Sequence, residues 1–289
     1  MILKKVITKI IKNKNKLSFK NNFYKELKKQ AFISLSRSHL KSFKKKKINI
    51  YLLGDLIFPF QSFGKKVSTL NLFSLDEIII FCYYISSRKK YQNVADMGAN
   101  IGLHSIMLGK FFKNVDSYEP DSMHTANIKK NLKLNKIKNV KIIKKAVSNK
   151  STNVDFIRVL NNSTSSHIAG LKPNAYGRLK TIKIKSIEFR KIIRKYDFIK
   201  MDVEGHEADI ILNTKKTDWE NTDLIVEVGS NDNAKKIFNH LYKNLKIPMF
   251  SQKNNWLEIK TLKHMPINYK EGSLFISKKN KFNFMNIMQ

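Results

Sequence analysis

Apolar and polar residues follow one another along this chain in the order expected of alternating strands and helices. From Tyr91 onward, short apolar runs of strand length are followed by segments with apolar residues at spacings of three and four. This alternation favours an α/β fold, with an open, mostly parallel sheet and helices on both faces. The predicted strands are 93–96, 115–118, 140–146, 181–186, 198–201, 224–228, 248–250 and 273–276, and the predicted helices are 101–112, 122–135, 187–195, 207–212 and 234–242. The polar segment 149–171 is predicted to be an irregular loop beside a site.

The residues before Tyr91 follow a different pattern. Strands are predicted at 48–53 and 67–72, and the sequence from Ser74 to Glu77 is a capping box ahead of an apolar helix. We therefore expect four parts: a basic, helical extension at 1–47, a lead-in of strands and helix at 48–90, the main domain at 91–278 and a tail at 279–289.

Apolar residues at the N-terminus form one stripe on a predicted basic helix. From Ile2 to Ile11 they recur at spacings of three and four, so residues 1–20 either lie on an anionic membrane or pack on the main domain. No apolar run reaches the roughly 18 residues of a membrane-spanning helix, and lysines interrupt the run that a secretory signal would need. The single cysteine, Cys82, excludes internal disulfides. A cytoplasmic location is favoured, with the inner membrane surface as an alternative.

The formal net charge of +34 indicates either an anionic partner or drift in composition. Residues 1–50 hold 16 of the 56 basic residues and one of the 22 acids. Only six basic residues are arginine, whereas proteins that bind phosphate commonly use arginine for bidentate contacts. Abundant lysine, asparagine and isoleucine are also what an AT-rich genome favours, so both explanations stay open.

Acidic residues occur at the ends of four predicted strands, where ligands bind in sheets of this kind. The first, Asp96, begins the run Asp96-x-Gly98-x-Asn100-x-Gly102. An acid stands where a dinucleotide fingerprint has its first glycine; it would repel a pyrophosphate but attract an ammonium group. The loop therefore favours S-adenosylmethionine over a nicotinamide dinucleotide. Glu119, 23 residues after Asp96, suits ribose hydroxyls because a carboxylate accepts two hydrogen bonds.

A second acidic motif follows the predicted strand 198–201. Asp202, Glu204, His206 and Glu207 occur within six residues, and Gly205 permits a tight turn that could bring their side chains together. A carboxylate and an imidazole could act as general base for a hydroxyl, or the set could bind a divalent metal. Alternatively, the two glutamates simply begin the next helix, where the helix dipole favours acids.

These motifs together resemble the FkbM family of S-adenosylmethionine-dependent methyltransferases. The resemblance lies in the runs 96–102, 118–120 and 199–207 and covers about 91–277; Met97 stands where valine or isoleucine is more usual. It implies a class I methyltransferase fold, Rossmann-like, with seven strands of which the last is antiparallel. It also implies O-methylation, commonly of sugar hydroxyls in glycans or of hydroxyls in natural products.

The resemblance also implies roles for individual residues. Asp202, Glu204 and His206 would face the methyl group and the acceptor. The family assigns no agreed base, and our own hypothesis is that His206 is the base, oriented by Glu204 or Asp202. Glu119 would hold the ribose. The implied cofactor-binding residues are Asp96, Gly98, Asn100, Gly102, Glu119, Pro120, Ala146, Val147 and Asp202.

The leading hypothesis is thus an O-methyltransferase acting on a carbohydrate or another hydroxyl-bearing acceptor. No residue is assigned to a metal, although a divalent metal stays open. The charge suggests two alternatives, an RNA methyltransferase and a non-enzymatic basic protein that binds membranes or nucleic acid on a decayed cofactor fold.

Overall fold

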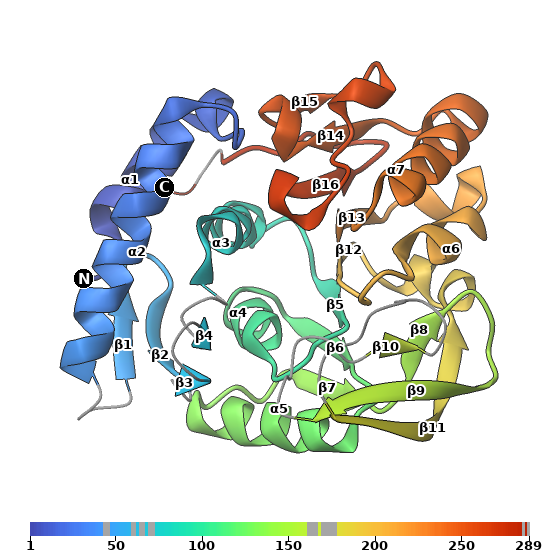
Figure 1. Ribbon diagram of the computed structural model, residues 1–289, viewed down its shortest axis with the longest axis horizontal. Coiled ribbons are helices and arrows are strands. Elements are labelled where there is room, and N and C mark those ends of the chain that lie inside the picture. The colour runs from blue at the N-terminus through green and yellow to red at the C-terminus, as the bar shows by residue number, and fades with distance from the viewer. Residues whose placement is uncertain are drawn as a thin grey trace.

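The computed structural model describes residues 1–42, 47–58, 62–63, 67–68, 73–160, 167–168, 178–284 and 287. A central sheet has the order β15-β14-β16-β13-β12-β5-β6-β7 (Figure 1). The five strands β13, β12, β5, β6 and β7 are parallel to one another, and β16 is antiparallel to both of its neighbours, β13 and β14. The strands are β5 (Asn93–Met97), β6 (Asn114–Tyr118), β7 (Val140–Ile143), β12 (Phe198–Met201), β13 (Asp223–Glu227), β14 (Met249–Ser251), β15 (Leu257–Glu258) and β16 (Ser273–Ile276). From β5 the strand order runs outward to β6 and β7 on one side and to β12 and β13 on the other. Sheets of this kind bind ligands at the point where the strand order reverses, here between β5 and β12.

This sheet confirms the predicted α/β class and the antiparallel last strand, with two differences. An eighth strand, the two-residue β15, pairs with β14 at the edge, beyond the seven that the resemblance implied. The predicted strand 140–146 is divided: β7 joins the central sheet, whereas β8 (Ala146–Ser148) pairs with β11 (Arg178–Glu188) in a second sheet.

The second sheet has the order β10-β9-β11-β8. β9 (Asn153–Leu160) pairs with β11 along its whole length, and β10 (His167–Ile168) pairs with β9. The prediction of an irregular loop at 149–171 is therefore wrong for β9 and β10, and we call these two strands the ribbon. Residues 161–166 and 169–171 lie outside the described residues. The alternation of Val154 and Phe156 with polar neighbours is a strand signal in an otherwise polar segment.

Helices cover both faces of the central sheet (Figure 1). Val94, Phe198 and Ile225 pack in one hydrophobic cluster with α3, α4 and α5, while their neighbours Ala95 and Ile199 pack in another with α6 and α7. Successive strand residues thus face opposite layers, as the period of two requires. The helices are α3 (Leu75–Ser87), α4 (Leu103–Phe111), α5 (Ser122–Leu134), α6 (Glu207–Leu212) and α7 (Asn231–Ile237), which a π-helix (Phe238–Leu245) continues.

Short 3-10 helices complete the main domain. Two of them, Phe189–Lys191 and Ile193–Lys195, replace the predicted helix 187–195. The other 3-10 helices are Lys216–Trp219, Gln252–Asn254, Leu262–His264 and Tyr269–Glu271.

The predicted capping box at the start of α3 is formed in part. Ser74 accepts a hydrogen bond from the N–H of Glu77, as a capping box requires, but the Glu77 carboxylate pairs with His104 (2.8 Å).

The N-terminal extension packs on the main domain through its apolar stripe. Val6, Ile7 and Ile10 are at most 1% exposed and join the cluster of α3. Any membrane contact by residues 1–20 would therefore depend on their exposed lysines. In the part of the chain that the structure describes, no helix is both long and apolar enough to cross a bilayer. The elements are α1 (Lys4–Lys12), a 3-10 helix (Lys14–Lys16), α2 (Asn22–Ser42), β1 (Lys47–Ile50), β2 (Gly54–Ile57), β3 (Ser62–Phe63) and β4 (Val67–Ser68).

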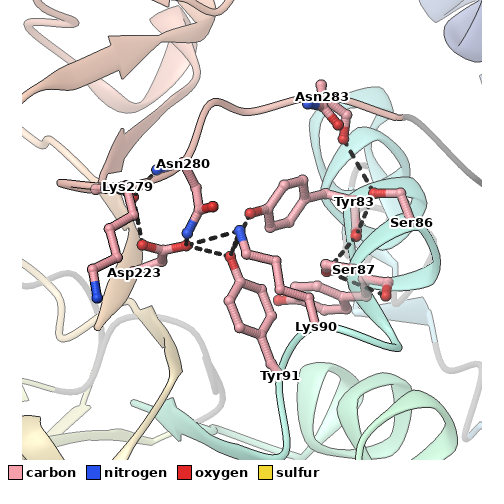
Figure 2. Close-up of polar contacts among 11 residues, drawn as sticks. Tyr83, Ser86, Ser87, Lys90, Tyr91, Asp223, Lys279, Asn280 and Asn283 are labelled. Carbon is pink, nitrogen blue, oxygen red and sulfur yellow. Dashed lines mark hydrogen bonds and ion pairs between the residues drawn. The ribbon is translucent and has the colours of Figure 1, made fainter. Parts of the chain in front are cut away.

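The described part of the C-terminal tail packs beside α3. Asn280 donates to the Asp223 carboxylate (2.7 Å), which also accepts from the Tyr91 hydroxyl (Figure 2). The ring of Phe282 stacks on Tyr83 with centroids 4.4 Å apart. Phe282 thus joins the hydrophobic cluster of α3, on the side of the central sheet away from α6 and α7.

Candidate active site

The first loop of the site connects β5 to α4. Gly98 has a φ of 81°, and a Cβ at this position would lie 1.8 Å from the backbone oxygen of Asp202. Asn100 (φ 51°) and Gly102 (φ 89°) are also left-handed, and Gly102 is the N-cap of α4. Glycine adopts this conformation without steric cost. Gly98 therefore lets this loop lie directly against the loop that follows β12.

Asp96 precedes the loop and is completely buried. Its Oδ2 accepts a hydrogen bond from Ser105 Oγ (2.6 Å), which in turn accepts one from Ser117 Oγ (2.7 Å). Its Oδ1 is buried and has no hydrogen-bond partner among the described residues. An unsatisfied buried carboxylate oxygen is costly. This oxygen is thus suited to a cationic donor on a bound ligand.

Glu119 stands at the end of the neighbouring strand, β6, and is also buried. Its two oxygens accept from the backbone N–H groups of Asn100 (2.9 Å) and Asp121 (3.0 Å). The Nδ1 atom of His124 lies 3.4 Å from Oε1. Burial alone would lower the pKa of His124, but the hydrogen bond and charge of Glu119 raise it above its ordinary value. A carboxylate has about four lone-pair positions, so Glu119 retains capacity for ligand hydroxyls.

The second loop follows β12 and contains the acidic motif. Glu204 has a φ of 59°, which is strained for a residue with a side chain, and Gly205 follows at 106°. The buried carboxylate of Glu207 accepts from the N–H groups of Val203 (3.0 Å) and Gly205 (3.1 Å). Glu207 is also the first residue of α6, so it ties the turn to the helix and holds Glu204 in its strained conformation.

Lys200, buried on β12, faces several acids. Its Nζ lies 3.4 Å from Asp202 Oδ2. Burial alone would lower the pKa of Lys200, but negative charges raise it above its ordinary value; they belong to Asp202, Asp96, Glu77 and Glu227. Burial, with the charges of Asp202 and Glu77, raises the pKa of Glu227 well above its ordinary range. Lys200 is thus a fixed cation that offsets part of this negative cluster.

A pocket that opens to solvent lies between the two loops and the ribbon; the space between its walls, open solvent included, is about 570 Å³. It contains two predicted catalytic residues, Asp202 and Glu204, but not His206. His206 Nε2 lies 3.0 Å from Ser148 Oγ, and burial lowers the pKa of His206. The predicted cofactor residues that line the pocket are Gly98, Asn100, Glu119, Pro120, Ala146, Val147 and Asp202, whereas Asp96 and Gly102 do not line it.

Several lining residues were not predicted as site residues. His124 follows Glu119 closely in sequence, but its position in a helix gave no sign of its contact with that carboxylate. Phe156 and Ile168 belong to the ribbon, which had been predicted as a loop. The remaining unpredicted lining residues are Tyr118, Lys145 and Val203.

Comparison with protein families decides which family the chain belongs to. The family described as Methyltransferase FkbM domain matches residues 96–258, more than half of the chain and both loops of the pocket. The chain belongs to the FkbM methyltransferase family. This confirms the resemblance seen in the sequence motifs. No curated protein sequence matches this FkbM methyltransferase.

Solved structures with a similar arrangement share little sequence with the FkbM methyltransferase. One is a proposed methyltransferase from Streptococcus mutans in complex with SAH (12% identity, 70% of this chain and 97% of that chain, TM-score 0.38). Another is a precorrin-6y C5,15-methyltransferase from Geobacter metallireducens (11% identity, 76% and 95%, TM-score 0.37). A third is a ribosomal protein L11 methylase from Lactobacillus delbrueckii (16% identity, 69% and 77%, TM-score 0.36).

The FkbM methyltransferase uses S-adenosylmethionine as its cofactor, and the residues present fit it. The orphaned Oδ1 of Asp96 has the charge that suits the ammonium group, although Asp96 lies behind the lining of the pocket, and Glu119, which lines the pocket, suits the ribose hydroxyls. Because Gly98 has no side chain, the two loops can lie against each other at the pocket. Among the described residues, no group of three or more His, Cys, Asp and Glu side chains is arranged to hold a metal ion.

Replacing Asp96 by asparagine is expected to weaken S-adenosylmethionine binding about 100-fold, because removing one partner of a buried charge pair costs about 2–5 kcal/mol. Ser105→Ala is the matched control, since it removes one hydrogen bond to Asp96 but keeps the carboxylate. Calorimetric titration measures both dissociation constants. Equal affinity of wild type and D96N would contradict the contact with the ammonium group.

Proposed function

We propose that this FkbM methyltransferase methylates a hydroxyl group of a carbohydrate. The main support is the pair of carboxylates, Asp202 and Glu204, that lines the pocket at the turn after β12. Carboxylates accept hydrogen bonds from hydroxyl groups, so two adjacent carboxylates suit an acceptor with several hydroxyls. O-methylation of sugar hydroxyls is also what the resemblance to the family implies.

The chain's own residues would bind and orient both substrates. The bound cofactor supplies an electrophilic methyl group on its sulfonium. Asp96 and Glu119 would hold the two polar ends of the cofactor, and Glu204 would orient the acceptor hydroxyl. We assign the role of proton acceptor to Asp202 rather than to His206, because Asp202 lines the pocket and His206 does not. Alignment of the hydroxyl with the methyl group would supply much of the acceleration.

Transfer of a labelled methyl group tests the acceptor class. The protein is incubated with radiolabelled S-adenosylmethionine and, separately, with polysaccharides, monosaccharides and total RNA. We expect label in the carbohydrate samples, recovered as O-methyl sugar after hydrolysis. Label in RNA alone, with binding that weakens steeply as salt rises, would instead support the RNA alternative.

A further inference from the structure

The ribbon forms the apolar end of the cofactor pocket. Phe156 on β9 and Ile168 on β10 line the pocket together with Ala146 and Val147 of β8. Phe156 is 5% exposed, so its ring is held between the pocket and the small cluster beneath the ribbon. An apolar wall with an aromatic ring suits a flat heteroaromatic base. In the cofactor, that group is the adenine.

Arg158 ties this wall to Asp121, which directly follows the pocket residues Glu119 and Pro120 in sequence. It lies two residues beyond Phe156, and its guanidinium forms two hydrogen bonds to Asp121: Nε to Oδ2 (2.5 Å) and Nη2 to Oδ1 (2.8 Å). The side chains are 13% and 1% exposed, so water screens the pair little. A planar guanidinium fixes direction as well as distance in such a bidentate contact.

Asp121 connects the ion pair to the cofactor-binding residues. Its Oδ1 accepts from the N–H of Met123 and so caps α5 (2.7 Å), and its own N–H donates to Glu119 Oε1 (3.0 Å). Any displacement of Asp121 would therefore also shift the carboxylate of Glu119. The ion pair thus joins β9, the start of α5 and the carboxylate that suits the ribose.

We propose that Phe156 forms the wall on which the cofactor's adenine binds, and that Arg158 is a positioning residue that fixes this wall through Asp121. Arg158 does not line the pocket, so it acts on the cofactor only by holding the ribbon in place. The role concerns cofactor binding and does not depend on the acceptor. A ribbon that is already in position needs no ordering when the cofactor binds.

Calorimetry with S-adenosylhomocysteine and with adenosine tests this role without any acceptor. Because the ribbon must then be ordered on binding, R158Q and R158K are each expected to raise both dissociation constants about tenfold. Lysine fails as a substitute because it lacks the bidentate fork. D96N is expected to weaken S-adenosylhomocysteine binding but to leave adenosine binding unchanged, since it acts at the amino-acid end.

Arg194→Gln is the matched control. Arg194 pairs with Asp218, a carboxylate that is also nearly buried (2% exposed) but lies outside the pocket. R194Q is expected to lower thermal stability less than R158Q, because Arg194 is 60% exposed and Asp218 keeps Arg190 as a partner, and to leave both dissociation constants unchanged. If R158Q does not fold, D121N breaks the same ion pair while keeping a side chain that caps α5.

Two results would overturn the proposal. One is R158Q and R158K binding both ligands as the wild type does, which would make the ion pair a structural tie only. The other is a loss confined to S-adenosylhomocysteine, which would place the effect at the amino-acid end instead of the adenine. F156L, which removes the ring but keeps an apolar side chain, is expected to weaken adenosine binding as well; unchanged binding would remove Phe156 from the wall.

Discussion

Alanine in place of Gly98 is expected to abolish cofactor binding and to lower the free energy of unfolding by about 4 kcal/mol, since left-handed strain and overpacking each cost about 1–3 kcal/mol. The added Cβ would lie 1.8 Å from the backbone oxygen of Asp202, so a backbone must move. Either loop that moves carries pocket residues with it. Denaturant unfolding and calorimetric titration with S-adenosylmethionine measure the two effects.

Two other glycines separate the causes of that loss. Gly54 has a φ of 74°, but a Cβ added there would have no described atom within 4 Å, so G54A should show the conformational strain alone, about 1–2 kcal/mol. Gly229 has neither close neighbours nor a left-handed φ, so G229A should change stability by no more than about 0.5 kcal/mol. A loss in G98A no larger than that in G54A would contradict the close approach of the two loops.

The parts of the site that could be predicted from sequence are those that local rules determine. A buried strand that ends in an acid, with two glycines after it, placed Asp96 at the end of β5 and Gly98 and Gly102 in the turn that follows; of these three only Gly98 lines the pocket. Glu119 followed because the next strand of a parallel sheet ends at the same edge. In each case the residue's role depends on its own strand and the turn after it.

Contacts between distant segments could not be predicted in this way. Nothing in the motif around His206 shows that its ring meets Ser148, 58 residues earlier, because that contact depends on where β8 lies relative to α6. Likewise, the acids around Lys200 come from four different elements. The ribbon was missed because β9, five of whose eight residues are apolar, lies between the polar runs 149–153 and 161–166, which favoured a loop for the whole segment.

The position of His206 also bears on which side chain removes the proton from the acceptor. Its imidazole is buried, lies near Ser148 and Asp209, and stays outside the pocket, whereas Asp202 is 34% exposed and lines the pocket. A base must come within hydrogen-bond reach of the hydroxyl that it deprotonates. On this ground we propose Asp202 as the base in place of His206, the choice made from the sequence, with Lys200 as the neighbouring cation.

Replacing Asp202 by asparagine is therefore expected to lower kcat about 1000-fold, within the 10²–10⁴ that general base catalysis contributes. Binding of S-adenosylmethionine should change much less, because Asp96 and Glu119, rather than Asp202, are assigned to the polar ends of the cofactor. H206Q is the matched comparison, since glutamine can keep a hydrogen bond to Ser148; its kcat should fall less than about tenfold, below the range for a lost base. Rates are measured at saturating cofactor with the carbohydrate found by labelling. The opposite order, a large loss in H206Q and a small one in D202N, would return the role of base to His206 and would require the turn after β12 to rearrange when the acceptor binds.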